Sequence, residues 1–140
     1  MTELPRIDNF MTTDIKFLKP DMSIHAAIKI LIDNGISGAP VVDEGGDLVG
    51  ILSKKDCLKV AFSDSYHQNV GGQVSDYMSV DVETVDVGTS LIDMAERFLG
   101  GTYHRFPVIR NGRLAGLISR HDILKAIEEQ WSVIGQQKEL

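Results

Sequence analysis

The sequence predicts a mixed α/β fold in which two βαββα repeats pack about a pseudo-twofold axis. Three observations lead to this prediction: a nearly constant offset between the two halves of the chain, apolar residues at helical spacing after a serine in each half, and a hairpin pattern after each helix. A chain of 140 residues with 43% hydrophobic and 24% charged residues is typical of one folded domain. We therefore expect a single compact module built from two copies of one unit.

The duplication is visible when the two halves are aligned. Residues 11–43 align on 78–110 at an offset of 67, and residues 46–59 align on 112–125 at an offset of 66. The segment GDLVGILSKKDCLK in the first copy corresponds to GRLAGLISRHDILK in the second. Chance does not place so many matches at one spacing, so the repeat decides the architecture. Within a module spanning 1–140, we expect repeat 1 at about 7–62, a polar connector at 63–73, repeat 2 at about 74–134 and a polar tail at 135–140.

Each copy is expected to begin with a short strand and a helix. The apolar segments IKFL at 15–18 and VETV at 82–85 are the strand candidates. Helices are expected to start after Ser23 and Ser90, which are natural N-caps, because apolar residues then recur on one helical face. Glycines just beyond the apolar pattern mark the ends of both helices.

Two strands and a second helix complete each copy. The strand candidates flank EGGD in the first copy and RNGR in the second, where Asn-Gly is a strong hairpin signal. A further apolar helical pattern follows each hairpin. A unit of about 50 residues buries little surface alone, so the two units are expected to pack on each other.

Composition excludes several classes of protein. The formal net charge of -6 disfavours binding to nucleic acid, which rewards an excess of basic residues. No apolar run approaches the length of a membrane span, so no membrane partner is expected. A single cysteine, Cys57, forms no internal disulfide, and the sequence has no clustered metal-ligand set, which fits a cytoplasmic protein without a metal cofactor.

Two related segments carry the strongest functional signal. Each begins with a serine and ends with an aspartate, at the point where a strand is expected to run into a helix. Between them stand two lysines in the first copy, and an arginine and a histidine in the second. Free N–H groups at a helix start suit a phosphate, and a carboxylate can accept hydrogen bonds from the hydroxyls of a ribose. A nucleotide would satisfy all of these groups at once. The residues are Ser53, Lys54, Lys55 and Asp56 in the first copy, and Ser119, Arg120, His121 and Asp122 in the second.

The same pattern has a purely structural interpretation. Ser-x-x-Asp at a helix start is also a capping box, which needs no ligand. On that interpretation the chain would be an adaptor that binds proteins through its exposed faces. The motif occurs twice at equivalent positions, each time followed by Leu-Lys, and this repetition favours a ligand site.

The sequence GISGAPVVD followed by GDLVGILSKKD, with YHRFPVI in the second copy, resembles the cystathionine β-synthase (CBS) domain. Two such domains in tandem form a Bateman module, and the resemblance covers about residues 7–127. It implies regulatory binding of AMP, ADP, ATP or S-adenosylmethionine in clefts between the two repeats. It also implies pairing of modules through their helices into a homodimer, and an effector protein that receives a conformational signal.

The resemblance implies roles for individual residues of the second copy. Asp122 matches a ribose-binding aspartate, with Ser119 supplying a hydroxyl at the same helix start. His104-Arg105 resembles a pair that grips phosphate in nucleotide-sensing members, and Tyr103 stands where members pack the base. The cleft at Asp122, with its own Arg120 and His121, is the favoured site, and Ile36 and Ser37 of the other repeat are expected to form its wall.

The first copy departs from this pattern. Asp56 and Ser53 match the ribose aspartate and the helix-start hydroxyl, but Ser37-Gly38 replaces the His-Arg pair. Lys54 and Lys55 are expected to compensate for the missing phosphate grip. The two clefts are therefore expected to be unequal. The sequence does not decide which of the two clefts receives His104 and Arg105.

Catalysis is not expected. His104, Asp122 and Ser119 could be imagined as a triad, but Ser119 and Asp122 belong to a helix start and the sequence has no nucleophile elbow. We therefore expect a regulatory binding module rather than an enzyme.

Overall fold

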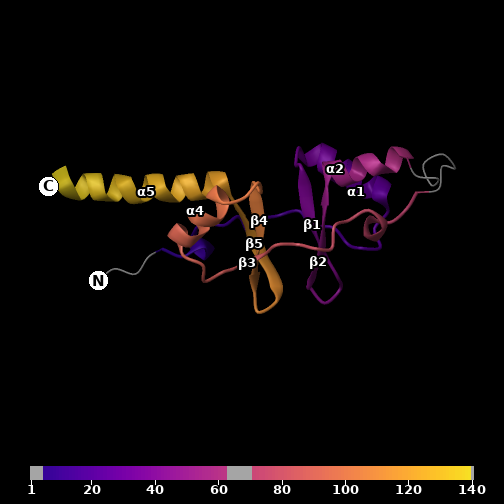
Figure 1. Ribbon diagram of the computed structural model, residues 1–140, viewed down its shortest axis with the longest axis horizontal. Coiled ribbons are helices and arrows are strands. Elements are labelled where there is room, and N and C mark those ends of the chain that lie inside the picture. Colours follow the sequence, from indigo (N-terminus) through magenta and orange to yellow (C-terminus); the bar gives the residue numbers. More distant parts are fainter. Residues whose placement is uncertain (1–4, 63–70, 140) are drawn as a thin grey trace. The chain divides into compact units, whose positions relative to one another are not determined.

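The computed structural model describes residues 5–62 and 71–139, with side chains described up to residue 132. The chain forms two compact units (Figure 1). Residues 63–70 of the expected connector lie outside the described residues. One unit holds most of the first repeat and the other most of the second: Lys16–Val82 with Gly112–Leu114, and Met1–Ile15 with Glu83–Asn111 and Ala115–Leu140.

The unit of the first repeat contains a hairpin and two helices. Ser23 caps the first helix, because its Oγ accepts a hydrogen bond from the N–H of Ala26 at 3.0 Å. The helix ends at Gly35, whose φ of 61° is the left-handed conformation that glycine adopts without strain. The elements are α1 (Ile24–Asn34), β1 (Gly38–Val42), β2 (Leu48–Ser53), α2 (Lys54–Leu58) and a 3₁₀ turn η2 (Lys59–Phe62), with β1 and β2 antiparallel.

The short strand expected at 15–18 is reduced to one bridge. Leu18 pairs in parallel with Val41, donating its N–H to Pro40 O and accepting the N–H of Val42, both at 2.9 Å. Pro20 follows two residues later and has no N–H, so it cannot continue a ladder. The first repeat therefore has a two-stranded sheet instead of three strands.

The unit of the second repeat has the full three-stranded sheet, in the order β3-β4-β5. Ser90 caps its first helix through the N–H of Asp93 at 3.1 Å. Asn111 and Gly112 both have positive φ, 53° and 79°, as a tight two-residue hairpin turn requires. In chain order the elements are β3 (Val85–Asp86), α4 (Leu91–Leu99), β4 (Arg105–Arg110), β5 (Arg113–Ser119) and α5 (Arg120–Glu139). Strands β3 and β4 are parallel.

Two differences from the expected boundaries concern the ends of this repeat. The strand expected at 82–85 begins only at Val85. The backbone of α5 is helical through Glu139, so the helix continues into the expected polar tail; Leu140 and the tail side chains lie outside the described residues. In Figure 1, α4 and the start of α5 lie to one side of the sheet. Among the described helices, none has the length and apolar character needed to cross a bilayer.

The segment that opens each repeat packs into the unit of the other repeat. We call residues 5–12 and 71–79 the leader segments. In the first of them Ile7 is fully buried in the same apolar cluster as Phe106 and Ile118 of the second repeat. The N–H of Ile7 donates to Thr89 O at 2.9 Å.

The second leader segment is placed in the same way. Val74 lies in the cluster with Leu18 and Leu52 of the first repeat, and its N–H donates to Met22 O at 2.9 Å. Each compact unit is therefore completed by a leader segment that the sequence repeat assigns to the other copy.

Candidate functional site

The Ser53-x-x-Asp56 motif lies where β2 passes into α2. The Oγ of Ser53 accepts the N–H of Asp56 at 3.1 Å, and Oδ2 of Asp56 accepts the N–H of Ser53 at 3.0 Å, which completes a capping box. The other carboxylate oxygen, Oδ1, lies 3.4 Å from Nζ of Lys59. Asp56 is only 7% exposed, and both of its carboxylate oxygens are thus engaged.

The Ser119-x-x-Asp122 motif has the same cap at the junction of β5 and α5. Oδ2 of Asp122 accepts the N–H of Ser119 at 2.9 Å, and the Oγ of Ser119 accepts the N–H of Asp122 at 3.2 Å. Asp122 is half-buried. Among the described residues nothing contacts its Oδ1 as a hydrogen-bond or ion-pair partner. The second junction therefore presents a free acceptor oxygen that the first does not.

The helix starts have fewer free N–H groups than expected. The N–H of the first helical residue is bonded to a carbonyl, Lys54 to Ser37 at 2.8 Å and Arg120 to His104 at 3.2 Å. The capping boxes use two more N–H groups at each junction. Because the fold already uses most of the N–H groups at each helix start, an anion at either junction would have to be held mainly by side chains.

These same bonds show which site residues lie together. Ser37, with Ile36 before it, is tied to Lys54 of its own repeat, and His104 is tied to Arg120 of its own repeat. Ile36 is half-buried and Ser37 is exposed. Within each repeat the structure therefore brings the residues before the hairpin to the Ser-x-x-Asp motif after it.

The basic and aromatic residues of the second junction differ in surroundings. His104, Arg105 and His121 are exposed, as are Lys54 and Lys55 at the first junction. Tyr103 is 48% exposed, and its ring packs on Phe106 with 5.4 Å between ring centroids and a tilt of 49°. A ring supported on one side and open on the other can stack on a planar base.

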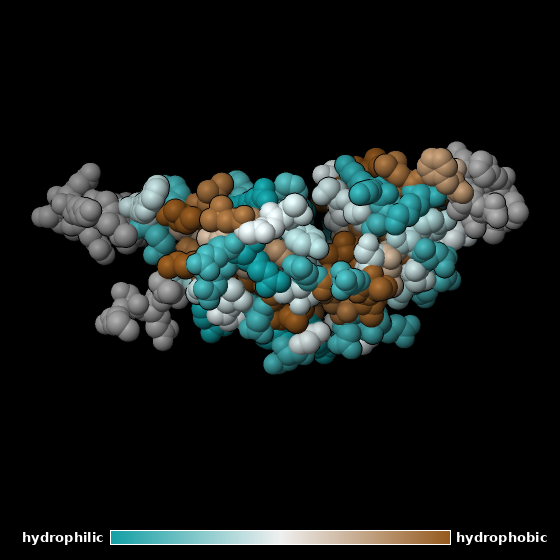
Figure 2. Space-filling view, viewed as in Figure 1, coloured by the Kyte–Doolittle hydropathy of each residue, from teal (hydrophilic) through white to brown (hydrophobic). Residues whose placement is uncertain are grey.

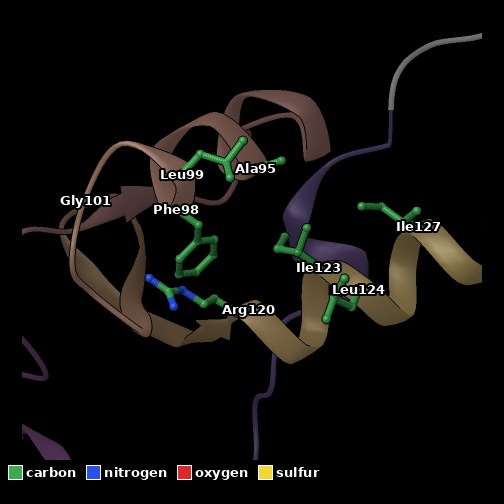
Figure 3. Close-up of a pocket in the computed structure, with 8 residues that line it drawn as sticks. All are labelled: Ala95, Phe98, Leu99, Gly101, Arg120, Ile123, Leu124 and Ile127. Carbon is green, nitrogen blue, oxygen red and sulfur yellow. The ribbon is translucent and has the colours of Figure 1, made fainter.

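The Arg120 side chain lies in an apolar pocket. Figure 3 shows it beside Phe98, with α4 side chains on one wall and α5 side chains on the other. The pocket has a volume of about 490 Å³. Of the residues expected to bind phosphate, Arg120 thus points into a groove between the two helices. The lining residues are Ala95, Phe98, Leu99, Gly101, Arg120, Ile123, Leu124 and Ile127.

Two other kinds of chemistry concern these junctions, a reactive cysteine thiolate and a bound metal ion. Burial, and then the neighbouring carboxylate of Asp56, raise the pKa of the Cys57 thiol, which disfavours the reactive thiolate. Within residues 5–62 and 71–139 no three His, Cys, Asp or Glu side chains gather in a way that could hold a metal ion.

Lys59 was missed by sequence reasoning. The available signal was the Leu-Lys step that follows both Ser-x-x-Asp motifs and places a lysine three residues after each aspartate. Only the structure shows that Lys59 contacts its aspartate, since Lys125 at the equivalent position has no hydrogen-bond or ion-pair partner among the described residues.

A family model described as the CBS domain matches residues 7–63 and 74–129. The chain is 27% identical over 126 residues to the uncharacterized protein MJ1225 of Methanocaldococcus jannaschii, covering 90% of this chain and 44% of that protein. It is 28% identical over 148 residues to the chloroplastic CBS domain-containing protein CBSX1 of Arabidopsis thaliana, covering 86% of this chain and 63% of that protein. The chain spans less than two thirds of the length of both relatives.

Solved structures share the architecture. The CBS-pair protein CBSX2 from Arabidopsis thaliana superimposes with a TM-score of 0.78 and 27% identity, covering 93% of this chain and 99% of that chain. A structure of CBSX2 in complex with AMP has a TM-score of 0.76 and 27% identity, covering 89% of this chain and 96% of that chain. The predicted α/β fold of two repeats is confirmed. With the family model matched twice along its length, the chain belongs to the CBS domain family.

Proposed function

We propose that this chain is a regulatory module that binds an adenosine-containing nucleotide at its Ser-x-x-Asp junctions and passes that event to an effector protein. The observation that carries the proposal is the free Oδ1 of Asp122 beside a completed cap. The ligand class includes AMP, ADP, ATP and S-adenosylmethionine. The similarity to CBSX2, whose structure contains AMP, supports this class.

The second junction offers one group for each part of such a ligand. The Oδ1 of Asp122 would accept hydrogen bonds from ribose hydroxyls. These bonds are strengthened because the acceptor is charged. The open face of Tyr103 would stack on the base, and the exposed His104 and Arg105 would bind phosphate. These roles are regulatory binding roles, and none of them is catalytic.

Signalling requires that the nucleotide prefer one conformation of the module. A ligand shifts a conformational equilibrium only by the difference between its affinities for the two states. The effector protein would read that shift. A cytoplasmic site of action is part of the proposal, since Cys57 is a free thiol.

Asp122→Asn tests the proposal. The side-chain carbonyl of asparagine can still cap Ser119, but its NH₂ group replaces the acceptor at Oδ1, so ribose binding is lost while the helix start is kept. We expect the affinity for AMP to fall about thirtyfold, because a hydrogen bond to a charged group contributes about 2 kcal/mol. Isothermal titration with AMP measures this change.

Asp93→Asn is the matched control. Asp93 occupies the same position after the cap Ser90, but at α4, outside both junctions. It should leave AMP affinity unchanged. Equal AMP binding by wild type and Asp122→Asn would show that the proposed ribose contact is wrong.

The adaptor interpretation remains the second candidate, because both capping boxes are complete without a ligand. It predicts no rise in the thermal midpoint with AMP, ADP, ATP or S-adenosylmethionine. A bound ligand at 100 times its dissociation constant would instead add about 2.7 kcal/mol to the free energy of unfolding.

A homodimer is the assembly that we propose. Figure 2 shows apolar surface over the region where Figure 1 places α4 and α5. Leu99 and Leu124 are exposed there and line the α4–α5 pocket, and Trp131 is 72% exposed further along α5. Apolar surface of this kind marks interaction sites.

Leu124→Glu is expected to convert the dimer to a monomer, because it places a charge in the apolar contact. Sedimentation velocity measures the mass. Val80→Glu, at an exposed valine outside these helices, serves as the control and should stay dimeric. A wild-type protein that sediments as a monomer would refute the proposed assembly.

A further inference from the structure

The two junctions share a cap but differ in one ion pair. Nζ of Lys59 lies 3.4 Å from Oδ1 of Asp56, whereas Lys125, its counterpart in the repeat, has no such partner among the described residues. The capping bonds to Oδ2 are nearly identical, 3.0 Å in one junction and 2.9 Å in the other. The bonding therefore differs at Oδ1, the oxygen that a ribose would need, and Asp56 is also the more buried of the two aspartates.

Helix geometry explains why the two lysines behave differently. Lys59 begins the 3₁₀ turn η2, with φ -62° and ψ -22°. Already at the end of α2 the N–H of Lys59 donates to the carbonyl of Asp56, three residues earlier, which is the bond of a 3₁₀ turn. Residues three apart are eclipsed in such a turn, so Lys59 comes over Asp56. Around Lys125 the chain stays in the long α5 helix, where residues three apart are offset around the axis because a turn takes about 3.6 residues.

The chemistry of a carboxylate makes this pair matter for ligand binding. Oδ2 of each aspartate already accepts a bond from its cap, so Oδ1 is the oxygen more available to hydroxyl groups. At Asp56 an ammonium group already lies against that oxygen, and an approaching hydroxyl must share or displace it. The Lys59 side chain is largely exposed, so the pair can open at a modest cost.

We infer that Lys59 is a specificity-determining residue that competes with ribose for Asp56, so that AMP binds first at the Asp122 junction and more weakly at the Asp56 junction. The inference rests on the proposed function and deepens it. It makes the two repeats an ordered pair of sites, with the order set by the 3₁₀-type turn at the end of α2.

The test isolates each junction before changing its lysine. Asp122→Asn removes the second junction, and in that protein Lys59→Met keeps the length of the side chain while removing its charge. Asp56→Asn removes the first junction, and in that protein Lys125→Met is the matched control. Isothermal titration with AMP is run on wild type, both single variants and both double variants, and circular dichroism and thermal midpoints establish that each is folded.

We expect Lys59→Met to raise the affinity for AMP about fivefold in the Asp122→Asn protein, which is the size of effect that an exposed ion pair supports. Lys125→Met should change the affinity of the Asp56→Asn protein by less than about twofold. The Asp56→Asn protein should bind AMP more tightly than the Asp122→Asn protein.

Unchanged or weaker binding after Lys59→Met would overturn the inference, and weaker binding would make Lys59 a ligand for the nucleotide. The reverse order of affinity between the two single variants would also overturn it. These outcomes leave the proposed function intact, because AMP is still bound. An absence of AMP binding in all five proteins would overturn both.

Discussion

Phe106→Ala is expected to lower the free energy of unfolding by about 4 kcal/mol, as large-to-small changes in a packed core do. Phe106 lies on β4 and is 2% exposed. Its ring packs against the rings of Phe98 and Tyr103 at centroid distances of 5.2 and 5.4 Å. The Cζ of Arg97 lies 5.2 Å from the centroid of the Phe106 ring. Alanine would remove all three contacts and leave a cavity in the core of the second-repeat unit.

Urea denaturation at one fixed protein concentration measures the change, since association would make stability depend on concentration. Phe62→Ala is the control, because Phe62 is 89% exposed and its removal should change the free energy of unfolding by no more than about 0.5 kcal/mol. Similar midpoints for the two variants would contradict the buried position of Phe106.

Gly116→Ala is expected to cost about 3 kcal/mol, the upper range for forcing extra volume into a packed site. A Cβ at Gly116 would stand 2.7 Å from Thr12 O and 3.0 Å from Met11 Sδ, so the first leader segment would have to move. That segment is held to β5 by two bonds between Thr12 and Leu117, at 2.8 and 2.9 Å. Displacement would weaken both.

Thermal unfolding should show a fall of about 10 °C for a chain of this size. Hydrogen exchange should speed up at the amides of Thr12 and Leu117 in particular, because their mutual bonds are the ones disturbed. Gly101→Ala is the control, since its nearest contact would be an ordinary 3.7 Å. Unchanged exchange at both amides would show that the leader segment tolerates the added methyl group.

The local elements were largely predictable because single residues specify them. Ser23 and Ser90 cap the expected helices, Gly35 ends the first of them, and Asn111-Gly112 forms the expected hairpin turn. These signals act within a few residues and need no knowledge of the rest of the fold.

The pairing of distant segments was not predictable in the same way. A short apolar segment such as 15–18 does not show that only Leu18 will find a partner. A repeat offset shows that two segments are alike, but not which copy each one packs against. The burial of Ile7 with Phe106 is a property of the whole fold and appears nowhere in the local pattern.

The candidate site was predicted in its residue types and missed in its hydrogen bonding. The Ser-x-x-Asp motifs lie at the expected strand-to-helix junctions. The carbonyls of Ser37 and His104, which occupy the first helical N–H groups, come from residues before the preceding hairpin. The contact of Lys59 with Asp56 depends on a change from α to 3₁₀ hydrogen bonding at the end of α2, which propensity alone does not indicate.

The exchange of leader segments imposes an order on folding during synthesis. Residues 5–12 leave the ribosome well before their backbone partners, which extend from Thr89 to Leu117. The leader segment 71–79 follows its own backbone partners, which lie between Pro20 and Ile51. Contacts of long sequence separation form slowly because a long loop must close first. The unit of the first repeat can therefore form most of its contacts before β5, the partner of the leader segment 5–12, has been synthesised.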